Sequence, residues 1–246
     1  MYTLPTIEEL ATLSLFRNLD VAAINRIRLS LGVSKVLAGD VIIGEPAPVR
    51  KSGHLRDRCV YIIYQGVVKV QLQDLRQPRD TNTILAILGA GQIVGEISLI
   101  DERTYSASVI SMTDGMLLYL QHAQLQRFFQ EMPALTHNIA QILADRLRIS
   151  NEHIHALATL KVRTRIARQL VFLARRYGQE GTGGKIFIPF SVTQVDLANL
   201  IGAKRLSVHR VIGGLRKAGL VAYHARDHIF TILDQGGLEE QCHVYG

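Results

Sequence analysis

The chain has 246 residues, 48% of them hydrophobic and 20% charged, which is the composition of a folded globular protein and excludes a disordered one. Its length allows one large or two modest domains, and we expect two. No apolar run approaches the roughly 18 residues of a membrane span. The N-terminus MYTLPTIEELATLSLF has early acidic residues instead of a basic leader, so we expect a cytoplasmic protein with no membrane partner.

The positive charge is concentrated in the C-terminal part of the chain. The net charge is +7, yet residues 1–145 hold 13 Lys and Arg against 14 Asp and Glu, whereas residues 146–246 hold 15 against 7. This asymmetry favours a polyanion as the partner of a basic C-terminal domain, with a merely solvated basic surface as the alternative. The two cysteines, Cys59 and Cys242, are far apart and lack metal-ligand spacing, so we expect no metal.

The first 120 residues change from a helical to a strand pattern. Residues 1–30 have apolar residues at spacings of three and four, which predicts short helices. From Val33 to about Leu120 the runs are KVLAGDVII, CVYIIYQGVVKVQL, TILAILGAGQIVGEISLI and SASVISMTDGMLLYL. Short strands with frequent glycine turns predict a β-barrel or jelly roll. The polar segment Glu45–Arg58 has two prolines, which predicts an exposed loop.

A long helical stretch follows, from about Ala123 to Arg176, with a break near Pro133. Within it a 4-3-4-3 spacing is typical of the seam between two paired helices, and the seam consists of Leu143, Leu147, Ser150, Ile154 and Leu157. We therefore expect this helix to pair with a second copy of the chain. Ser150 and the neighbouring Asn151 interrupt the seam, and they serve either to set its register or to bind a ligand.

The C-terminal segment contains the spacing of a helix-turn-helix. YGQEGTGGK reads as a glycine-rich loop, KIFIPF as a short strand and YHARDHIFTI as a closing hairpin, with two helices between the last two. Ala198 is small enough for two helices to cross, Gly202 permits positive φ in the turn, and Val208 and Val211 are apolar positions of the second helix.

The second of these helices separates an apolar stripe from a basic face. The stripe comprises Val208, Val211, Ile212 and Leu215, so its neighbours must face outward. An exposed leucine among arginines suits the major groove, where leucine touches a thymine methyl and arginine binds guanine. We predict DNA contacts from Thr193, Lys204, Arg205, Leu206, Ser207, His209 and Arg210, with Arg205 as the first specificity residue. Thr193 is alternatively only an N-cap, and His209 only a surface histidine.

This order of segments resembles the CRP/FNR family of bacterial transcription regulators. The resemblance covers almost the whole chain and is carried by four runs: YIIYQGVVKV, GAGQIVGEISL, RLRISNEHIHALATLKVRTRIARQLVFLA and VTQVDLANLIGAKRLSVHRVIGGLRKAGLV. It implies an α+β chain with an N-terminal double-stranded β-helix (jelly roll), a long dimerisation helix and a C-terminal winged helix-turn-helix. It also implies a homodimer on a two-fold symmetric duplex DNA operator.

The resemblance further implies an effector site in the jelly roll. Cyclic-AMP-binding members carry a cassette of Gly-Glu followed about ten residues later by Arg-Ser-Ala, and Gly95, Glu96, Ser106 and Ala107 match it. Tyr105 stands in the arginine's place, and tyrosine does not supply arginine's bidentate pair with a phosphate. Arg103 takes over only if the loop is rebuilt. Ser150 and Asn151 match the Thr-Ser pair that meets the adenine, and Ile97 completes the expected lining of the site.

A second subgroup resembles this chain at other positions. The global nitrogen regulators of cyanobacteria, which sense 2-oxoglutarate, have an Arg-x-Tyr-x-Ala run similar to RTYSA here and a helix arginine matched by Arg146. They also have an apolar residue at the position of Leu206. Glu96 and Asn151 depart from that subgroup, and an anionic Glu96 would repel a dicarboxylate. Cyclic AMP, 2-oxoglutarate and no effector at all therefore remain three alternatives.

The functional prediction is a homodimeric transcription regulator that, as an activator, would also contact RNA polymerase; activator and repressor stay open as alternatives. We expect residues 1–132 to form the effector domain, 133–160 the dimerisation helix and hinge, and 161–246 the DNA-binding domain. Effector binding shifts the dimer between two states through a hinge at Ala158–Lys161. No residue set suited to catalysis is present, so we expect no enzyme. The alternative is a cyclic-nucleotide-binding regulatory subunit of an enzyme or channel, which leaves the basic C-terminal part unexplained.

Overall fold

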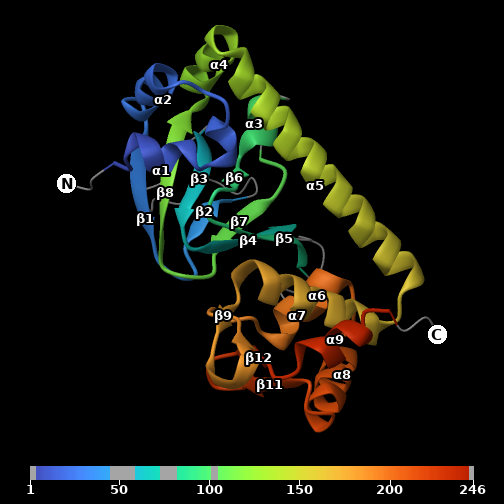
Figure 1. Ribbon diagram of the computed structural model, residues 1–246. Coiled ribbons are helices and arrows are strands. Elements are labelled where there is room, and N and C mark those ends of the chain that lie inside the picture. The colour runs from blue at the N-terminus through green and yellow to red at the C-terminus, as the bar shows by residue number, and fades with distance from the viewer. Residues whose placement is uncertain (1–3, 45–58, 73–81, 101–104, 244–246) are drawn as a thin grey trace. The chain divides into compact units, whose positions relative to one another are not determined.

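The computed structural model describes residues 4–44, 59–72, 82–100 and 105–243 (Figure 1). The chain divides into two compact units, one of Met1–Gln73 with Leu85–Ile149 and the other of Asp74–Ile84 with Ser150–Gly246. The predicted loop over residues 45–58 and the candidate Arg103 lie outside the described residues.

The first unit begins with short helices, as the spacing of apolar residues predicted. They are α1 (Ile7–Ala11), the 3-10 turn η1 (Ser14–Phe16) and α2 (Val21–Arg28). Thr6 and Glu9 close a capping box at the start of α1, and the Asp20 carboxylate accepts from the Ala23 amide at the start of α2. Leu10, Phe16 and Ile27 from these elements are buried against the sheet that follows.

Two four-stranded antiparallel sheets form the predicted double-stranded β-helix. The strands are β1 (Gly32–Val36), β2 (Val41–Ile43), β3 (Cys59–Gln65), β4 (Val67–Leu72), β5 (Thr83–Gly89), β6 (Ile93–Val94), β7 (Ser108–Ser111) and β8 (Gly115–Gln121). One sheet has the order β1-β8-β3-β6 and the other β2-β7-β4-β5. Figure 1 shows the two sheets facing each other in the first unit.

Burial on both faces of strand β3 explains why its residues CVYII are continuously apolar. Tyr61 and Ile63 point into the core between the two sheets, whereas Val60 and Ile62 point into the core beneath the helices. Successive side chains of a strand lie on opposite faces, so a strand covered on both faces needs apolar residues at every position. Burying one such side chain stabilises the fold by about 1.5–3 kcal/mol.

One segment that was expected to continue as strand is a helix. The run GQIVGEISLI forms only the short strand β6 and then turns into α3 (Glu96–Ile100). Gly95 has φ 86°, a left-handed conformation that ends the strand, and the Ser98 hydroxyl donates to the Gly95 carbonyl over 2.9 Å. The apolar pattern alone did not distinguish a strand from one turn of buried helix, because both are short apolar runs.

Three helices follow the jelly roll: α4 (His122–Glu131), α5 (Pro133–Thr159) and α6 (Val162–Tyr177). The break predicted near Pro133 is present, with the proline at the first position of α5, where its missing N–H is not needed. A second break at Leu160 and Lys161 falls at the predicted hinge. Among the described helices, none is long and apolar enough to cross a bilayer.

The second unit is a winged helix-turn-helix, as predicted. After α6 come β9 (Gln179–Glu180), the 3-10 turn η2 (Thr182–Gly184), β10 (Ile186–Phe187), α7 (Gln194–Ile201), α8 (Arg205–Lys217), β11 (Val221–His224), β12 (Ile229–Ile232) and α9 (Gln235–Glu240). The four strands form one sheet in the order β11-β12-β10-β9. Only Ile186 and Phe187 of the expected strand KIFIPF form β10, although the Ile188 amide still donates to the Phe230 carbonyl over 2.9 Å before Pro189, which has no N–H.

Candidate functional site

The turn between α7 and α8 has the geometry that its residues predicted. Ala198 is buried, and Gly202 has φ 60° and ψ 49°, the left-handed conformation that closes α7. A Cβ at Gly202 would lie 2.9 Å from Cδ2 of Leu157, so the Leu157 side chain would have to shift, and the positive φ is the stronger reason for glycine here. Arg165 of α6 donates to the Ile201 carbonyl over 2.7 Å, which stabilises the negative end of α7.

Helix α8 presents its basic face outward, as predicted. Val208, Ile212 and Leu215 are buried, and Val211 is half-buried at the edge of the stripe. On the opposite face Leu206 is 70% exposed. Lys204, Arg205, His209 and Arg210 are also exposed, and Ser207 is half-buried. Within the described residues no carboxylate pairs with Lys204, Arg205 or Arg210, so these cations are available to an external anion.

Thr193 is the N-cap of α7. Its hydroxyl accepts from the Asp196 amide over 2.9 Å and donates to Asp196 Oδ2 over 2.6 Å, while the Thr193 amide donates to the same carboxylate over 3.1 Å. The hydroxyl proton is therefore already used within the protein. A phosphate contact from Thr193 stays a prediction, and it would have to use the hydroxyl's remaining lone pair indirectly, through water.

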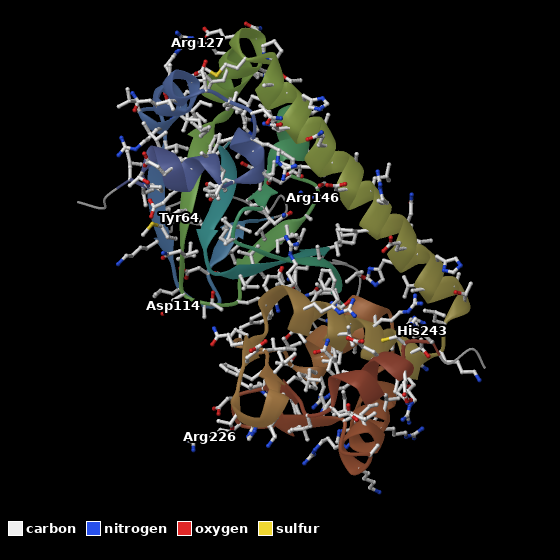
Figure 2. The ribbon with its side chains drawn as sticks, in the orientation of Figure 1. Tyr64, Asp114, Arg127, Arg146, Arg226 and His243 are labelled. Atoms are coloured by element: carbon white, nitrogen blue, oxygen red, sulfur yellow. The ribbon has the colours of Figure 1, made fainter. Side chains whose placement is uncertain are left out.

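Two polar contacts near α8 were missed by the sequence patterns. The His209 Nδ1 lies 3.1 Å from Gln194 Oε1 at the start of α7, and the Tyr223 hydroxyl lies 2.7 Å from His228 Nδ1 in the β11–β12 hairpin. Burial raises the pKa of Tyr223, while the nearby Arg205 acts in the opposite direction. These pairs join separate elements, and no local sequence signal marks them. Arg226 is exposed in the turn of the same hairpin (Figure 2).

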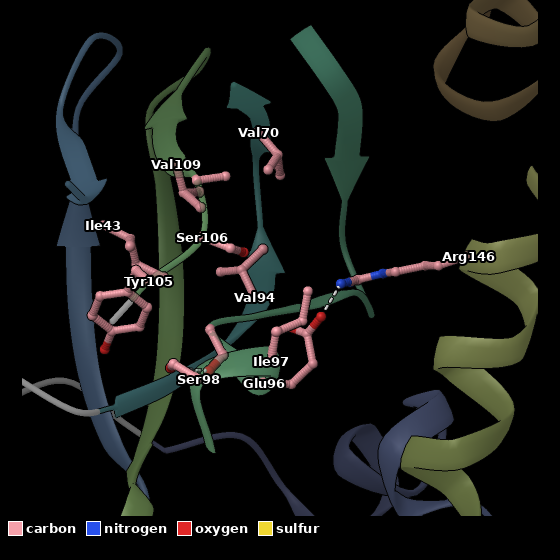
Figure 3. Close-up of a pocket in the computed structure, with 12 residues that line it drawn as sticks. Ile43, Val70, Val94, Glu96, Ile97, Ser98, Tyr105, Ser106, Val109 and Arg146 are labelled. Carbon is pink, nitrogen blue, oxygen red and sulfur yellow. Dashed lines mark hydrogen bonds and ion pairs between the residues drawn. The ribbon is translucent and has the colours of Figure 1, made fainter. Parts of the chain in front are cut away.

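A second candidate site is a cavity of about 70 Å³ in the jelly roll (Figure 3). Six of the predicted effector residues line it together: Gly95, Glu96, Ile97, Tyr105, Ser106 and Arg146. The remaining walls come mainly from apolar strand residues such as Ile43, Val70 and Val109. Pockets that enclose drug-sized ligands usually have volumes of about 300–1,000 Å³, so this cavity must widen to admit a nucleotide.

One ion pair lies in the wall of the cavity, between a buried carboxylate and a half-buried arginine. Glu96 is 2% exposed and accepts from Arg146 Nη1, while Arg146 Nη2 donates to the Ile93 carbonyl. Figure 3 shows Arg146 reaching from α5 to the α3 carboxylate. Burial raises the pKa of Glu96, and the Arg146 charge only partly offsets this effect. The pair neutralises both charges and joins α5 to the strand–helix turn of the jelly roll.

Gly95 and Tyr105 line the cavity and pack closely against Cys59 of strand β3. A Cβ at Gly95 would lie 2.7 Å from the Cys59 carbonyl oxygen and 3.3 Å from Cε1 of Tyr105. The Tyr105 hydroxyl accepts from the Cys59 amide over 3.0 Å and donates to the Cys59 carbonyl over 3.1 Å. In this structure the tyrosine hydroxyl is therefore bonded to strand β3 at the position where cyclic-AMP-binding members have arginine.

Two other predicted effector residues lie elsewhere on the chain. Ser150 and Asn151 are exposed on α5 and belong to the second unit, whereas every residue that lines the cavity belongs to the first. The seam around them is also exposed: Leu147, Ile154 and Leu157 are among the exposed large hydrophobic residues, and Leu143 is half-buried. Their roles in ligand binding and pairing stay predictions.

Comparison with known proteins identifies both domains. The family model of the cyclic nucleotide-binding domain matches residues 36–132, and that of the Crp-like helix-turn-helix domain matches residues 164–241. A cyclic AMP receptor protein of Thermus thermophilus is 32% identical over 174 residues, which are 71% of this chain and 75% of the relative. A CRP-like cAMP-activated global transcriptional regulator of Mycobacterium tuberculosis is 27% identical over 224 residues, 91% of this chain and 95% of the relative.

The solved structures agree as well. The crystal structure of a CRP/FNR-family transcriptional regulator from Thermus thermophilus has a TM-score of 0.69 and 27% sequence identity, covering 87% of this chain and 100% of that one. The printed names of these relatives describe transcription regulators. The helix-turn-helix match contains α7 and α8, and the cyclic nucleotide-binding match contains every residue lining the cavity except Arg146. The chain therefore belongs to the CRP/FNR family of DNA-binding transcription regulators.

Proposed function

We propose that this regulator reads a two-fold symmetric operator as a homodimer and responds to a cyclic nucleotide bound in the jelly roll. The observation that carries the DNA part is the outward face of α8, where the 70% exposed Leu206 stands among unpaired cations. A thymine methyl in the major groove offers such a leucine an apolar contact, while the cations beside it meet guanine and phosphate. Lys204, Ser207 and Arg210 then contact phosphates and Arg205 a guanine.

The homodimer is supported by the exposed half of α5. Leu147, Ile154 and the interposed Ser150 follow the spacing of a two-helix seam, and the leucine and isoleucine side chains are largely exposed in a single chain. Pairing of two such helices removes these side chains from water. In this proposal residues 1–132 bind the effector, 133–160 pair the subunits and provide the hinge, and 161–246 bind DNA in the cytoplasm. RNA polymerase is the expected further partner of an activator of this type.

A cyclic nucleotide fits the charges of the cavity better than a dicarboxylate. Glu96 already neutralises Arg146, so two additional carboxylates would meet one buried anion and no unpaired cation among the described lining residues. A cyclic nucleotide has a single negative charge, and its sugar hydroxyl can donate to the Glu96 carboxylate. The matching domain model and the names of the relatives also support this class.

Ligand entry is expected to act on α5. Because the cavity is small, a nucleotide must displace part of its lining, and Arg146 is the lining residue that α5 contributes. A ligand that binds one arrangement of this pair better than the other shifts the population of dimer states toward that arrangement. The hinge at Ala158–Lys161 then re-aims the helix-turn-helix.

The DNA part is tested by titrating fluorescent duplexes at several salt concentrations, with and without cyclic AMP. We expect log affinity to fall with log salt by about 0.9 per phosphate contacted. Arg205→Ala should weaken binding to a selected operator by about 1–3 kcal/mol and relax the preference at one base pair. A chain that shows no duplex affinity even at low salt would instead be a regulatory subunit of another protein.

The effector part is tested by calorimetry with cyclic AMP and with 2-oxoglutarate. Heat from cyclic AMP alone is expected, and Arg146→Ala should reduce it because the variant leaves the Glu96 carboxylate unpaired in the cavity. Heat from 2-oxoglutarate that disappears in Arg103→Ala and in Arg146→Ala would assign a dicarboxylate. Absence of heat from both ligands would make the regulator constitutive.

A further inference from the structure

Gln194 joins helix α7 to the exposed face of α8. It is the first residue of α7, and its side-chain oxygen Oε1 lies 3.1 Å from Nδ1 of His209, which is 15 residues later in α8. His209 lies one helical turn beyond Arg205 and Leu206, on the same exposed face. The contact therefore ties the start of one helix to a candidate base-reading side chain of the other.

This contact favours one of the two tautomers of the neutral imidazole. Gln194 Oε1 faces the ring, and an amide oxygen only accepts hydrogen bonds, so this arrangement favours the tautomer in which Nδ1 carries the hydrogen. In the neutral ring the other nitrogen, Nε2, is then an acceptor with a free lone pair. Nothing in the described part of the chain bonds to Nε2, and the side chain is exposed.

An outward-facing acceptor discriminates between bases. In the major groove adenine N6 and cytosine N4 are the donors, whereas guanine N7 and O6 and thymine O4 are acceptors. A neutral histidine whose Nε2 carries no hydrogen accepts a hydrogen bond from adenine N6 or cytosine N4. Opposite guanine or thymine, the Nε2 lone pair faces another acceptor and is repelled. This distinguishes His209 from Arg205, which only donates and therefore selects guanine.

We propose that Gln194 is a positioning residue that holds His209 in the Nδ1-protonated form, so that its Nε2 reads an adenine or a cytosine in each operator half-site. The proposal deepens the proposed function, because it rests on α8 lying in the major groove. Gln194 itself reads no base: it acts through the ring that it orients, and its loss leaves the basic face of α8 in place.

The first test does not involve DNA. Full-length protein with 15N-labelled histidine is examined by NMR at about pH 8, where a histidine of ordinary pKa is neutral. The His209 signals are assigned by their disappearance in His209→Gln. We expect the proton of His209 on Nδ1, and we expect it to leave that nitrogen in Gln194→Met, which keeps the shape of the side chain but removes the acceptor. A proton on Nε2 in the unaltered protein, or no change in Gln194→Met, overturns the positioning role.

The second test measures base preference. Symmetric duplexes are selected from a randomised pool by the unaltered protein, with and without cyclic AMP. His209→Ala should abolish the preference at one position of the half-site. At that position duplexes with adenine or cytosine should bind about two- to tenfold better than those with guanine or thymine, the range of one net hydrogen bond. Gln194→Met should lose this ratio while retaining the guanine preference of Arg205.

A control variant and the possible contrary results distinguish failure of this inference from failure of the proposed function. Gln169→Met removes an amide from α6 of the same unit and should change neither the NMR signals nor the base ratio. A ratio in favour of guanine or thymine, or one that survives in Gln194→Met, overturns the base-reading role. Failure to select any duplex overturns the proposed function and the base reading together, whereas the NMR result still decides whether Gln194 orients His209.

Discussion

Glu96 and Arg146 show how much a single pair of side chains depends on its surroundings. A carboxylate that is 2% exposed would be unfavourable by itself, and the guanidinium that reaches it comes from a different element. Burial has the larger effect, so the pKa of Glu96 is raised despite the neighbouring positive charge. The charged form of Glu96 is therefore less favoured than that of a carboxylate exposed to water.

The raised pKa predicts a pH dependence of stability. Between the unfolded value near 4.5 and the raised folded value, the folded chain binds more protons than the unfolded one. The unfolding free energy of the unaltered protein, minus that of Glu96→Gln, should therefore fall as pH rises from about 4.5 through the folded pKa, and then level off. Urea unfolding at a series of pH values measures this difference.

Glu131→Gln is the matched control for this prediction. Glu131 is exposed and hydrogen-bonded to Arg127, with Arg26 also nearby, and these arginines lower its pKa. The unfolding free energy of the unaltered protein, minus that of Glu131→Gln, should rise with pH. This is because the contribution of Glu131 is lost as pH falls through its lowered pKa. If the Glu96 difference instead rises with pH, the attraction of Arg146 outweighs burial.

At the scale of elements, the helix-turn-helix uses glycine in two different ways. Gly202 closes α7 with φ 60°, a conformation that favours glycine, and a Cβ at this position would lie close to the end of the Leu157 side chain. Gly213 lies inside α8, where a Cβ would meet no atom within 4 Å. A glycine inside a helix is less stable than alanine by about 0.5–1 kcal/mol. Helix α8 is therefore less stable than it would be with alanine at this position, where there is room for the methyl group.

Alanine should therefore have opposite effects at these two glycines. Gly202→Ala should destabilise the unit by about 1–2 kcal/mol for the left-handed conformation alone, and more if Leu157 must move. Gly213→Ala should stabilise it by about 0.5–1 kcal/mol. Denaturant unfolding monitored by circular dichroism measures both. A stabilising Gly202→Ala, or a destabilising Gly213→Ala, would contradict these assignments.

At the scale of the whole molecule, α5 serves two structural purposes along its length. Its first half packs Leu135, Ile139 and Ile142 into the core of the jelly roll, and its second half is exposed. A polar surface would be expected on an unpaired helix of a monomer. Leu147 and Ile154 instead remain exposed at seam spacing, which is the surface that a second subunit would cover.

This surface predicts a position-specific effect on assembly. Ile154 on the seam is 64% exposed, and Ile149 on another face of the same helix is 56% exposed. Ile154→Asp should convert a dimer into a monomer, because the seam would bury two facing carboxylates. Ile149→Asp should leave the dimer intact. Sedimentation at micromolar concentration distinguishes these outcomes, and equal behaviour of the two variants would argue against the seam.

Much of this architecture follows from local patterns. Alternation and glycine turns predicted the jelly roll, a 3.6-residue period predicted the helices, and the positions of Ala198 and Gly202 predicted the turn before the basic helix. The outward orientation of Leu206 was also predicted, because the opposite stripe of α8 had to be buried. These features depend on residues within one or two turns of one another, and that is the range over which periodicity carries information.

Contacts between distant residues required the folded chain. Glu96 and Arg146 are 50 residues apart and His209 and Gln194 are 15 apart, and no spacing rule relates the members of either pair. The same holds for the hydroxyl of Tyr105, which bonds to strand β3 instead of facing an anion. A side chain's partner is determined by which elements pack together, so the chemistry of both sites emerged only when the sheets and helices had been assembled in space.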